Sequence, residues 1–491
     1  MKATTQQFLN QSPLPFYVAG QWINREATLK VTDPASGEQI ALVCRAGAVD
    51  VDAAMQAAES AASTWQALTP AARGERLTRL GDLIDAHTQE LAELESIDVG
   101  KTLAGAIGFD VPYAAQCFRY FARIAQDVSC DVDLGLSLTD GHVIKKPYGV
   151  CGFIFPWNFP LTLCAWGIAP ALAAGNTVVI KPASETPLST LYLAKLAAEA
   201  GIPAGVINVL PGSGGEVGET LIAHPRLKHM SFTGSTEVGR HIAEVCGRNL
   251  VPVKLELGGK GAAVIFDDAD IAAAVDGLVG AVTLNCGQVC CTATRWYVHE
   301  AIAARFSALA VEKMNAIRTG KGLLDSSDMG PICTKKQLHK VLECIAIAQS
   351  HGARILCGGV RDLAGDRAAG HFIRPTLLAA DDDNPMVQEE IFGPVACLLT
   401  FKDEDEVIAR VNRNPYGLAN SVWTQDRQRA QRVAAALVSG NSWINVHNLF
   451  EYGLPYGACN QSGYGGGVNS PETLEGYLRK QAVAGLRQET V

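Results

Sequence analysis

Residues 147–180, PYGVCGFIFPWNFPLTLCAWGIAPALAAGNTVVI, contain no charged side chain. Their length and hydropathy alone would suffice to cross a bilayer. However, Pro156, Pro160 and Pro170 interrupt the stretch, and its parts match shorter elements in the order strand, turn, helix, strand. The stretch therefore predicts a buried β–α–β unit in the core of a large α/β protein, and not a membrane span.

Short apolar runs followed by helical patterns recur after this unit. Strands that alternate with helices at such intervals are typical of a parallel, doubly wound sheet, which binds ligands at the carboxyl ends of its strands. The first series of strands is expected at 149–155, 177–181, 206–210, 229–232 and 253–257. A second series, which predicts a second α/β domain, is expected at 296–298, 354–356, 396–401 and 443–445.

Three other segments depart from this alternation. Residues 1–50 predict an irregular arm with short strands, whereas the apolar spacing of residues 51–127 predicts helices. Residues 128–147 have an extended pattern. Apolar and polar side chains alternate in it as far as an Asp140-Gly141 turn, which indicates a hairpin-like strip. We expect this strip to reach another part of an assembly.

The composition is that of an ordinary globular protein, with 491 residues of which 48% are hydrophobic and 19% charged. The net charge of -9 argues against nucleic acid or an anionic membrane as a partner, because both bind clustered positive charge. The 14 cysteines show no short repeated spacing, which favours a reduced, cytoplasmic chain. Residues 1–17 lack the apolar region of a secretion signal and are not rich in arginine, so neither export nor organelle import is expected.

Residues 283–295, TLNCGQVCCTATR, place two adjacent cysteines after a Gly-Gln turn. A thiol that follows such a turn is a candidate nucleophile, because the turn can direct the side chain and its own N–H into one cavity. The alternative interpretation is a small buried apolar residue. No metal site is expected, since Cys286, Cys290 and Cys291 lack a second pair of ligands or a neighbouring His at zinc spacing.

Five motifs occur in a fixed order along the chain, namely PWNFP at 156–160, FTGST at 232–236, ELGGK at 256–260, GQVC at 287–290 and EIFGPV at 390–395. This order resembles the aldehyde dehydrogenase superfamily over nearly the whole chain. The resemblance implies a Rossmann-type cofactor domain, a second α/β catalytic domain and a small bridging β element that makes a homodimer or homotetramer. The cofactor domain would comprise residues 1–127 and 148–257, and the catalytic domain residues 258–458. The bridging element would comprise residues 128–147 and 472–491.

The resemblance also implies the catalytic residues. Cys290 matches the family's nucleophile, which attacks an aldehyde and forms a thiohemiacetal. Asn158 matches the side-chain donor to the resulting oxyanion, and the alternative is a polar residue that ends a strand. Glu256 matches the base that activates water for hydrolysis of the thioester, and the alternative is a strand-end carboxylate facing solvent. The apolar neighbours Leu255 and Leu257 favour a cleft.

The cofactor implied by the resemblance is NAD or NADP. Members that prefer NAD often carry an acidic residue three places after the lysine that bonds the ribose, but this chain has Ser184 there, with Glu185 next. A serine leaves room for a 2′-phosphate, so NADP is expected to be accepted. The candidate cofactor residues are Phe155, Pro156, Trp157, Lys181, Ser184, Gly214, Phe232, Gly234, Ser235, Leu257, Glu390 and Phe392.

The substrate is expected to be a small-molecule aldehyde in a pocket shaped by Phe159, Trp166, Phe450 and Tyr456. Aromatic walls suit apolar or amphipathic aldehydes. Glu451 could instead attract a cationic aldehyde and Arg123 an anionic one, and the sequence does not decide between them. Glycines at 466 and 467 replace the Arg-Glu of many members, which leaves the proton route from the base open. A coenzyme A-acylating enzyme and a non-catalytic scaffold are the alternative functions.

Overall fold

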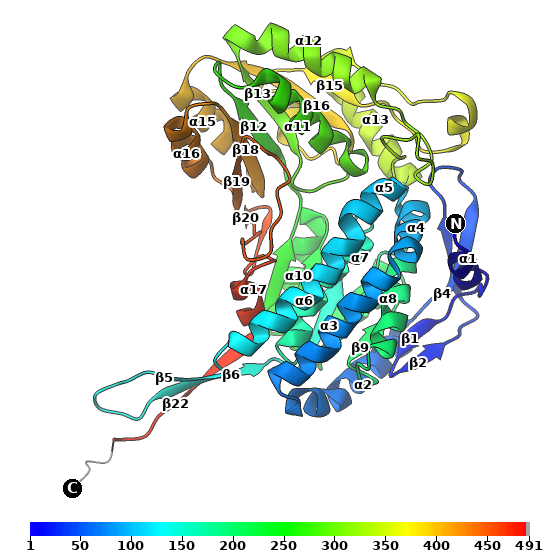
Figure 1. The fold of residues 1–491 in the computed structure, drawn as a ribbon, viewed down its shortest axis with the longest axis vertical. Helices are drawn as coiled ribbons and strands as arrows, with labels where there is room; N and C mark the ends of the chain where they lie inside the picture. Colours follow the sequence, from blue (N-terminus) through cyan, green and yellow to red (C-terminus); the bar gives the residue numbers. More distant parts are fainter. Residues whose placement is uncertain (488–491) are drawn as a thin grey trace.

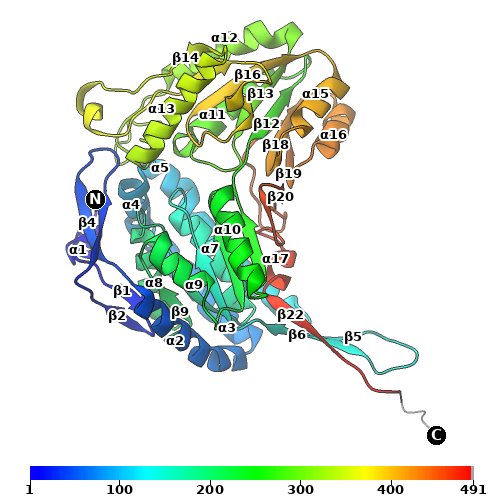
Figure 2. The ribbon, with the colours of Figure 1, turned by 180° about the vertical axis from the view of Figure 1, so that it is seen from behind.

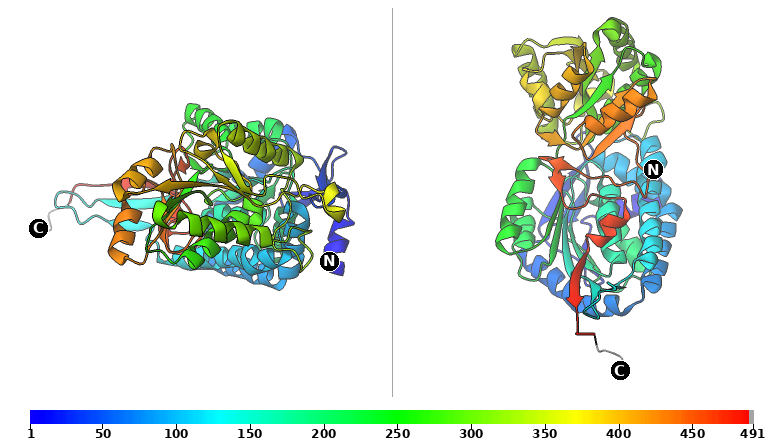
Figure 3. Two further views of the ribbon diagram at one scale, coloured as in Figure 1. Left: turned by 90° about the horizontal axis from the view of Figure 1, so that it is seen from above. Right: turned by 90° about the vertical axis from the view of Figure 1, so that its left-hand side faces the viewer.

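The computed structural model describes residues 1–487, which form two lobes and a projecting arm (Figure 1). Each lobe is built around one large β-sheet, and Figure 3 shows the lobes stacked along the long axis of the molecule. The predicted α/β class with two sheets is confirmed. The bounds of the expected strands agree with the structure to within two residues, except that β13 (Ala293–His299) begins three residues earlier than expected.

The sheet of the first lobe has a parallel centre with antiparallel strands at both edges. Its order is β2 (Gln21–Ile23), β1 (Phe16–Val18), β9 (Ile207–Val209), β8 (Thr177–Lys181), β7 (Val150–Ile154), β10 (His229–Thr233), β11 (Val253–Glu256) and β21 (Gly463–Tyr464). The strand order reverses between β8 and β10, around β7. In a sheet of this kind the crevice beyond the carboxyl ends of the strands at such a reversal is the expected ligand site.

Helices cover both faces of this sheet. One face carries α7 (Pro160–Ala173) and α8 (Leu188–Glu199), with α3 (Pro70–Ala86) and α6 (Val111–Asp127) outside them. The other face carries α2 (Ala48–Ala67), α9 (Glu219–Ile222) and α10 (Thr236–Arg248), and Figure 2 shows α9 and α10 from that side. The helices expected at 51–127 are therefore confirmed, and α4 (Thr88–Val99) and the short α5 (Leu103–Gly105) belong to the same series.

The charge-free stretch at 147–180 forms β7, α7 and β8 as predicted, and almost all of it is buried. Pro160 stands in the first turn of α7, where the missing N–H of proline does not matter. Among residues 1–487, no helix combines the length and apolar composition needed to cross a membrane.

Residues 1–50 are more regular than the sequence predicts. They contain helix α1 (Ala3–Leu9), which the sequence did not predict, and the hairpin β3 (Thr28–Thr32)–β4 (Gln39–Cys44). Contacts distant in sequence hold this short helix, because Thr5 Oγ1 donates to Glu93 Oε2 at 2.6 Å on α4. Seven residues are too few to be helical by propensity alone.

The second lobe contains a seven-stranded sheet in which only the β14–β15 pair is antiparallel. The order is β14 (Arg354–Cys357), β15 (Thr376–Ala379), β16 (Val395–Phe401), β13 (Ala293–His299), β12 (Gly261–Ile265), β18 (Ala419–Trp423) and β19 (Asn441–Ile444). Its helices are α11 (Ile271–Thr283), α12 (Glu300–Ala316), α13 (Lys335–Ser350), α14 (Pro385–Gln388), α15 (Glu404–Asn412) and α16 (Arg427–Ala436). Asp270 caps α11 and Thr334 caps α13 through side-chain oxygens.

A three-stranded sheet projects from the first lobe as the arm seen in Figure 1. It consists of β5 (Asp131–Asp133), β6 (His142–Pro147) and β22 (Leu478–Val483), and β22 follows α17 (Pro471–Glu475). The predicted hairpin at 128–147 is confirmed. Residues 488–491 of the expected bridging range 472–491 lie outside the described residues.

Candidate active site

A strained turn precedes the two cysteines. Asn285, Cys286 and Gly287 have φ angles of 47°, 55° and 69°, so three consecutive residues adopt the left-handed conformation. Side chains other than glycine pay about 1 kcal/mol or more for this backbone, and such strain persists only where the surroundings impose it. At Gly287 a Cβ would lie 2.2 Å from the backbone of Gly393, so this position admits no side chain. The predicted turn is confirmed, and it begins one residue earlier than expected.

Side-chain amides tie this turn to the PWNFP segment. Asn285 Nδ2 donates to the carbonyl of Asn158 at 2.8 Å, and Asn158 Nδ2 donates to the carbonyl of Gln288 at 2.9 Å. Gln288 Nε2 donates to the Asn285 carbonyl, and Gln288 Oε1 accepts from the Cys333 N–H, both at 2.8 Å. The segment that carries Asn158 and the segment that carries Cys290 are therefore held in one fixed arrangement.

Two hydrogen-bond donors lie beside the Cys290 thiol. The amide of Asn158 carries two N–H groups, of which one is used by Gln288, while the side chain is only 3% exposed. The backbone N–H of Cys290 has no partner among residues 1–487. Both donors are thus free for an oxygen that binds next to the half-buried sulfur. This arrangement can stabilise a negative charge that develops on that oxygen.

The two cysteines differ in their surroundings. The Cys290 Sγ lies 3.7 Å from the Tyr456 hydroxyl, whereas the fully buried Cys291 donates from Sγ to Asn448 Oδ1 at 3.3 Å. The hydrogen bond with Cys291 and burial raise the pKa of the Cys290 thiol well above its ordinary value. Burial likewise raises the pKa of Tyr456, and the neighbouring thiols and the Glu256 carboxylate add to that shift. Cys290 therefore needs a nearby proton acceptor before it can attack.

Glu256 ends β11 close to this group. Its Oε2 is buried and has no hydrogen-bond partner among the described residues. Burial raises the pKa of Glu256 to about 7, and the positive charge of Lys254 opposes that shift. A carboxyl with this pKa changes its protonation state near neutral pH, which is the property required of a general base.

The glycines after Glu256 admit groups that a side chain would exclude. A Cβ on Gly258 would lie 2.7 Å from Glu390 Oε2, and one on Gly259 would lie 2.4 Å from the carbonyl oxygen of Cys290. The Gly259 N–H donates to Glu390 Oε1 at 3.0 Å. The ELGGK and EIFGPV motifs therefore meet directly beside the thiol.

One cavity of about 180 Å³ joins these motifs. The Trp157 ring meets the Phe392 ring edge to face, with centroids 5.4 Å apart. Gln337 on α13 donates to the carbonyls of Ile391 and Phe392, which holds Phe392 at a φ of 58°. The predicted residues that line this cavity are Pro156, Trp157, Asn158, Gly234, Ser235, Leu257, Cys290, Glu390 and Phe392.

The remaining candidate cofactor residues do not line this cavity. Lys181 ends β8, donates to the Pro182 carbonyl at 2.9 Å, and has a pKa that burial lowers to about 8. Ser184 Oγ donates to the Gly212 carbonyl at 2.9 Å, and Gly214 begins the π-helical turn Gly214–Gly218. Phe155 and Phe232 are buried supports beneath Gly167 and Gly234.

Comparison with known proteins identifies the family. The model of the aldehyde dehydrogenase family matches residues 22–483. The chain belongs to the aldehyde dehydrogenase family. It is 41% identical over 468 residues to a phenylacetaldehyde dehydrogenase of Pseudomonas fluorescens, with 92% of each chain covered.

Solved aldehyde dehydrogenases share the whole fold. An aldehyde dehydrogenase from Bacillus cereus in complex with NAD+ superposes with a TM-score of 0.97 at 36% identity, covering 99% of both chains. A betaine aldehyde dehydrogenase from Staphylococcus aureus in complex with NAD+ superposes with a TM-score of 0.95 at 34% identity, covering 98% of this chain and 97% of that one. The aldehyde dehydrogenase fold predicted from the motifs is confirmed.

In this aldehyde dehydrogenase, the four predicted pocket residues belong to a larger aromatic cluster. The Trp166 ring lies 5.7 Å from both Phe450 and Tyr456, centroid to centroid, and Phe450 lies 5.4 Å from Tyr456. Phe159 joins through Phe109 at 6.2 Å. The cluster also contains Phe109, Tyr113, Tyr120, Trp443 and Tyr452, which sequence reasoning did not assign to the pocket.

The missed aromatic residues come from α6, the turn before it, β19 and the loop after β19, so no local motif marks them. The only available signal was the aromatic spacing of Phe109 and Tyr113, which is equally typical of a helix packed on a core. Gln337 and Lys340 of α13 also line the thiol cavity and were missed for the same reason.

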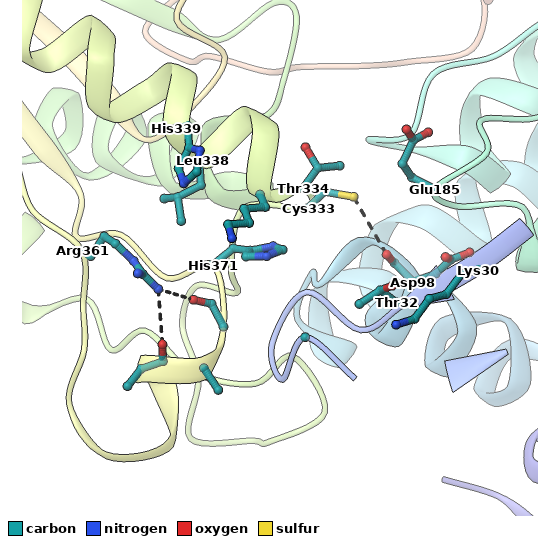
Figure 4. Close-up of a pocket in the computed structure, with 15 residues that line it drawn as sticks. Lys30, Thr32, Asp98, Glu185, Cys333, Thr334, Leu338, His339, Arg361 and His371 are labelled. Atoms are coloured by element: carbon teal, nitrogen blue, oxygen red, sulfur yellow. Dashed lines mark hydrogen bonds between the residues drawn. The ribbon is translucent and has the colours of Figure 1, made fainter. Parts of the chain in front are cut away.

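A second cavity, of about 600 Å³, lies away from the thiol and is shown in Figure 4. Its walls come from the β3–β4 hairpin, α4, α13 and the loop near Arg361. Figure 4 shows Asp98 and Glu185 on one side and Arg361 and His371 on the other. None of the predicted site residues lines it, but Glu185, the neighbour of Ser184, does.

Proposed function

We propose that this chain oxidises an aldehyde to the carboxylic acid with NAD or NADP, through a thioester on Cys290. The observation that carries the proposal is the cavity in which the Cys290 thiol, the free N–H of Asn158 and the Glu390 carboxylate meet, and which is also lined by Leu257, the residue after Glu256. A bound nicotinamide dinucleotide would supply the hydride acceptor.

Each residue then has a defined task. The Cys290 thiol loses its proton to solvent, and its sulfur attacks the aldehyde carbon. Asn158 and the Cys290 N–H donate to the oxyanion of the thiohemiacetal. After loss of hydride the thioester remains, and Glu256 removes a proton from the water that hydrolyses it. The fixed turn at 285–288 holds the sulfur and the two N–H donors at constant positions relative to each other.

Hydrolysis is favoured over acyl transfer to coenzyme A. The chain carries a buried carboxylate at position 256 whose pKa lies near neutrality, whereas family members that acylate coenzyme A commonly lack this base. A retired scaffold is disfavoured because a buried, unpartnered carboxylate and a strained turn both destabilise a fold that has no use for them.

We also propose that NADP is accepted beside NAD. The α10 helix begins after Ser235, and its free N–H groups can face a pyrophosphate. Ser184 carries no charge at the position where NAD-preferring members often carry a carboxylate, which leaves room for a 2′-phosphate. The solved relatives named above contain NAD+, which supports NAD as the second cofactor.

The substrate that fits best is an apolar, aromatic aldehyde. The cluster around Trp166 and Phe450 offers ring faces and edges, which pack well against another ring. Glu451 and Arg123 are both exposed, and the Arg123 guanidinium lies over the Tyr120 ring. The name of the phenylacetaldehyde dehydrogenase relative supports the same class.

A homodimer or homotetramer is the assembly that we propose. The arm has two free strand edges, at β5 and β22, which can pair with a partner's sheet. Its leucines are exposed, Leu138 by 80% and Leu486 by 85%, and an exposed apolar group of this kind indicates an interface.

A panel of aldehydes tests the proposal. Phenylacetaldehyde, hexanal, betaine aldehyde and a carboxy-aldehyde would each be assayed with NAD and with NADP, with and without coenzyme A, and the products identified by mass spectrometry. We expect the free acid in every productive case and the highest kcat/KM with phenylacetaldehyde. Phe450→Ala should lower kcat/KM for phenylacetaldehyde more than for hexanal. Acyl-CoA as the main product, or no turnover with any aldehyde, would contradict the proposal.

A further inference from the structure

A buried lysine lies on the same strand as the proposed base. Lys254 and Glu256 are two residues apart on β11, so their side chains point to the same face of the sheet. In the parallel register, Ser231 of β10 stands opposite Lys254, and Thr233 stands opposite Glu256. The face that they share is the one covered by α6, α7 and the segment after α17, since Phe153 of β7 lies opposite Ser231 and packs near Gly167 and Tyr477.

Polar atoms without partners are concentrated on this face. Lys254 is 3% exposed, and among the described residues its Nζ has no hydrogen-bond partner and no carboxylate within ion-pair distance. Glu256 Oε2, the Tyr477 hydroxyl and His229 Nδ1 are likewise buried and unpartnered. The Lys254 ammonium lies 5.9 Å from the centroid of the Tyr477 ring, whose other side meets His229 at 4.9 Å. Buried ammonium groups are normally paired, so this lysine has an unusual position for one with a purely structural role.

We propose that Lys254 is a positioning residue that takes up, through a bridging water, the proton that Glu256 removes from the hydrolytic water. The inference rests on the proposed function of Glu256. In the step, an O–H bond of water breaks as its oxygen bonds to the thioester carbon, the C–S bond breaks to release the Cys290 thiolate, and the proton goes to Glu256. Lys254 first releases a proton from its ammonium to solvent, and the neutral amine then takes up the proton of Glu256, which returns Glu256 to its carboxylate form and Lys254 to its ammonium form.

The protonation states of the neighbouring groups agree with this order of transfer. Burial lowers the pKa of Lys254 to about 8 and raises that of Glu256 to about 7, so both groups can exchange protons near neutral pH. The groups that face Lys254 from other elements do not compete. Burial raises the pKa of Cys117 on α6 and of Tyr477, so both stay protonated, and it lowers the pKa of His229 to about 3, so that ring stays neutral.

The glycines at 466 and 467 give the inference its context. They offer no ionisable side chain at these two positions. Lys254 is an ionisable group on the same strand and the same face as Glu256.

Two substitutions separate the charge of Lys254 from its capacity to accept a proton. Lys254→Met removes both, whereas Lys254→Arg keeps the charge but cannot act as a base, because arginine stays protonated. Cys151→Ala is the matched control, since Cys151 is buried on the same face of β7 and does not titrate near neutral pH. Each variant would be assayed with NAD and phenylacetaldehyde, by stopped flow for the hydride burst and at steady state for kcat. The steady-state assays would run from about pH 5.5 to about pH 9, roughly the range over which a base with a near-neutral pKa titrates.

The burst should stay within about twofold of wild type in every variant, because hydride transfer precedes the step in which Lys254 acts. In Lys254→Met, kcat at pH 7 should fall about tenfold, and its acidic limb should move to higher pH by about one unit. In Lys254→Arg the acidic limb of the kcat–pH profile should lie at the same pH as in wild type, whereas kcat at pH 7 should be as low as in Lys254→Met. Added methylamine should restore kcat in Lys254→Ala, and Cys151→Ala should resemble wild type.

Three results would overturn the inference: wild-type kcat in Lys254→Arg, an unchanged limb and kcat in Lys254→Met, or a burst that falls together with kcat in a folded Lys254→Met. Lys254→Met removes a buried charge and should fold at least as well as wild type. If Lys254→Arg does not fold, Lys254→Met and the methylamine experiment decide. Absence of a burst or of acid product in wild type would instead refute the proposed function itself.

Discussion

Replacement and titration of Glu256 give a quantitative prediction about deacylation. Because burial raises the pKa of this carboxyl to about 7, its basic form increases through neutral pH. The ionised fraction is about one tenth at pH 6 and about nine tenths at pH 8, for a single group that titrates one unit from each. If hydrolysis of the thioester limits turnover, kcat should therefore rise about tenfold between pH 6 and pH 8. An exposed glutamate with its ordinary pKa of 4.5 would give a flat profile over that range.

Stopped-flow and steady-state measurements separate the two steps that matter. Wild type should release reduced nicotinamide in a burst followed by a slower phase, and only the slow phase should follow the ionisation of Glu256. At a pH where the thiol ionises, Glu256→Gln should keep the burst. The rate of its slow phase should fall by about 10²-fold or more. A kcat that does not change between pH 6 and pH 8, or Glu256→Gln with wild-type turnover, would refute the assignment.

The same shift has a consequence for stability that serves as a control. A carboxyl whose folded pKa is raised contributes stability that is fully present below its unfolded pKa and is lost as pH rises through its folded pKa. For Glu256 the window runs from about 4.5 to about 7. Glu256→Gln should therefore have a higher Tm than wild type at pH 8 and a smaller difference at pH 5, and a lower Tm at pH 8 would indicate that the substitution damages the fold.

Three further predictions concern the oxyanion donor, the cofactor and the arm. Asn158→Ala should lower the rate of the hydride burst by about 10²- to 10³-fold while leaving cofactor affinity within about twofold, as stopped-flow and fluorescence titration would show. Ser184→Glu should lower kcat/KM for NADP at least tenfold with little change for NAD, because a carboxylate would repel the 2′-phosphate, and equal loss with both cofactors would contradict this account. Leu138→Asp should give a smaller oligomer by light scattering with a normal circular dichroism spectrum, because it places a charge on the exposed apolar side of the arm.

Much of the fold could be predicted from local sequence patterns. The β–α–β unit at 147–180 combines β-branched runs with a proline at the first turn of a helix, and both signals are local. Helix α1 was missed because it is held by Glu93 on a helix far along the chain and not by its own propensity. The same reason explains the missed aromatic residues, whose cluster forms only when α6 and the loop after β19 come together.

The site was predictable where backbone constraints leave a mark in the sequence. Only glycine fits at three positions, because a Cβ would meet a neighbouring group: Gly393 at position 287, Glu390 at 258 and Cys290 at 259. The motifs that contain these glycines can therefore be recognised in the sequence alone. Gln337 and Lys254 leave no such mark. Their importance follows from what they face across the fold, a carbonyl pair in one case and a buried carboxylate in the other.

The central claim is that the acyl intermediate forms on Cys290 and not on its neighbour. Glu256→Gln would be mixed with phenylacetaldehyde and NAD, quenched in acid during the burst, digested, and the peptide that spans residues 283–295 analysed by tandem mass spectrometry. The account predicts one acyl group per peptide on Cys290, with Cys291 unmodified and with no acyl group in Cys290→Ala. An acyl group on Cys291, or a full burst of reduced nicotinamide without any acylated peptide, would contradict it.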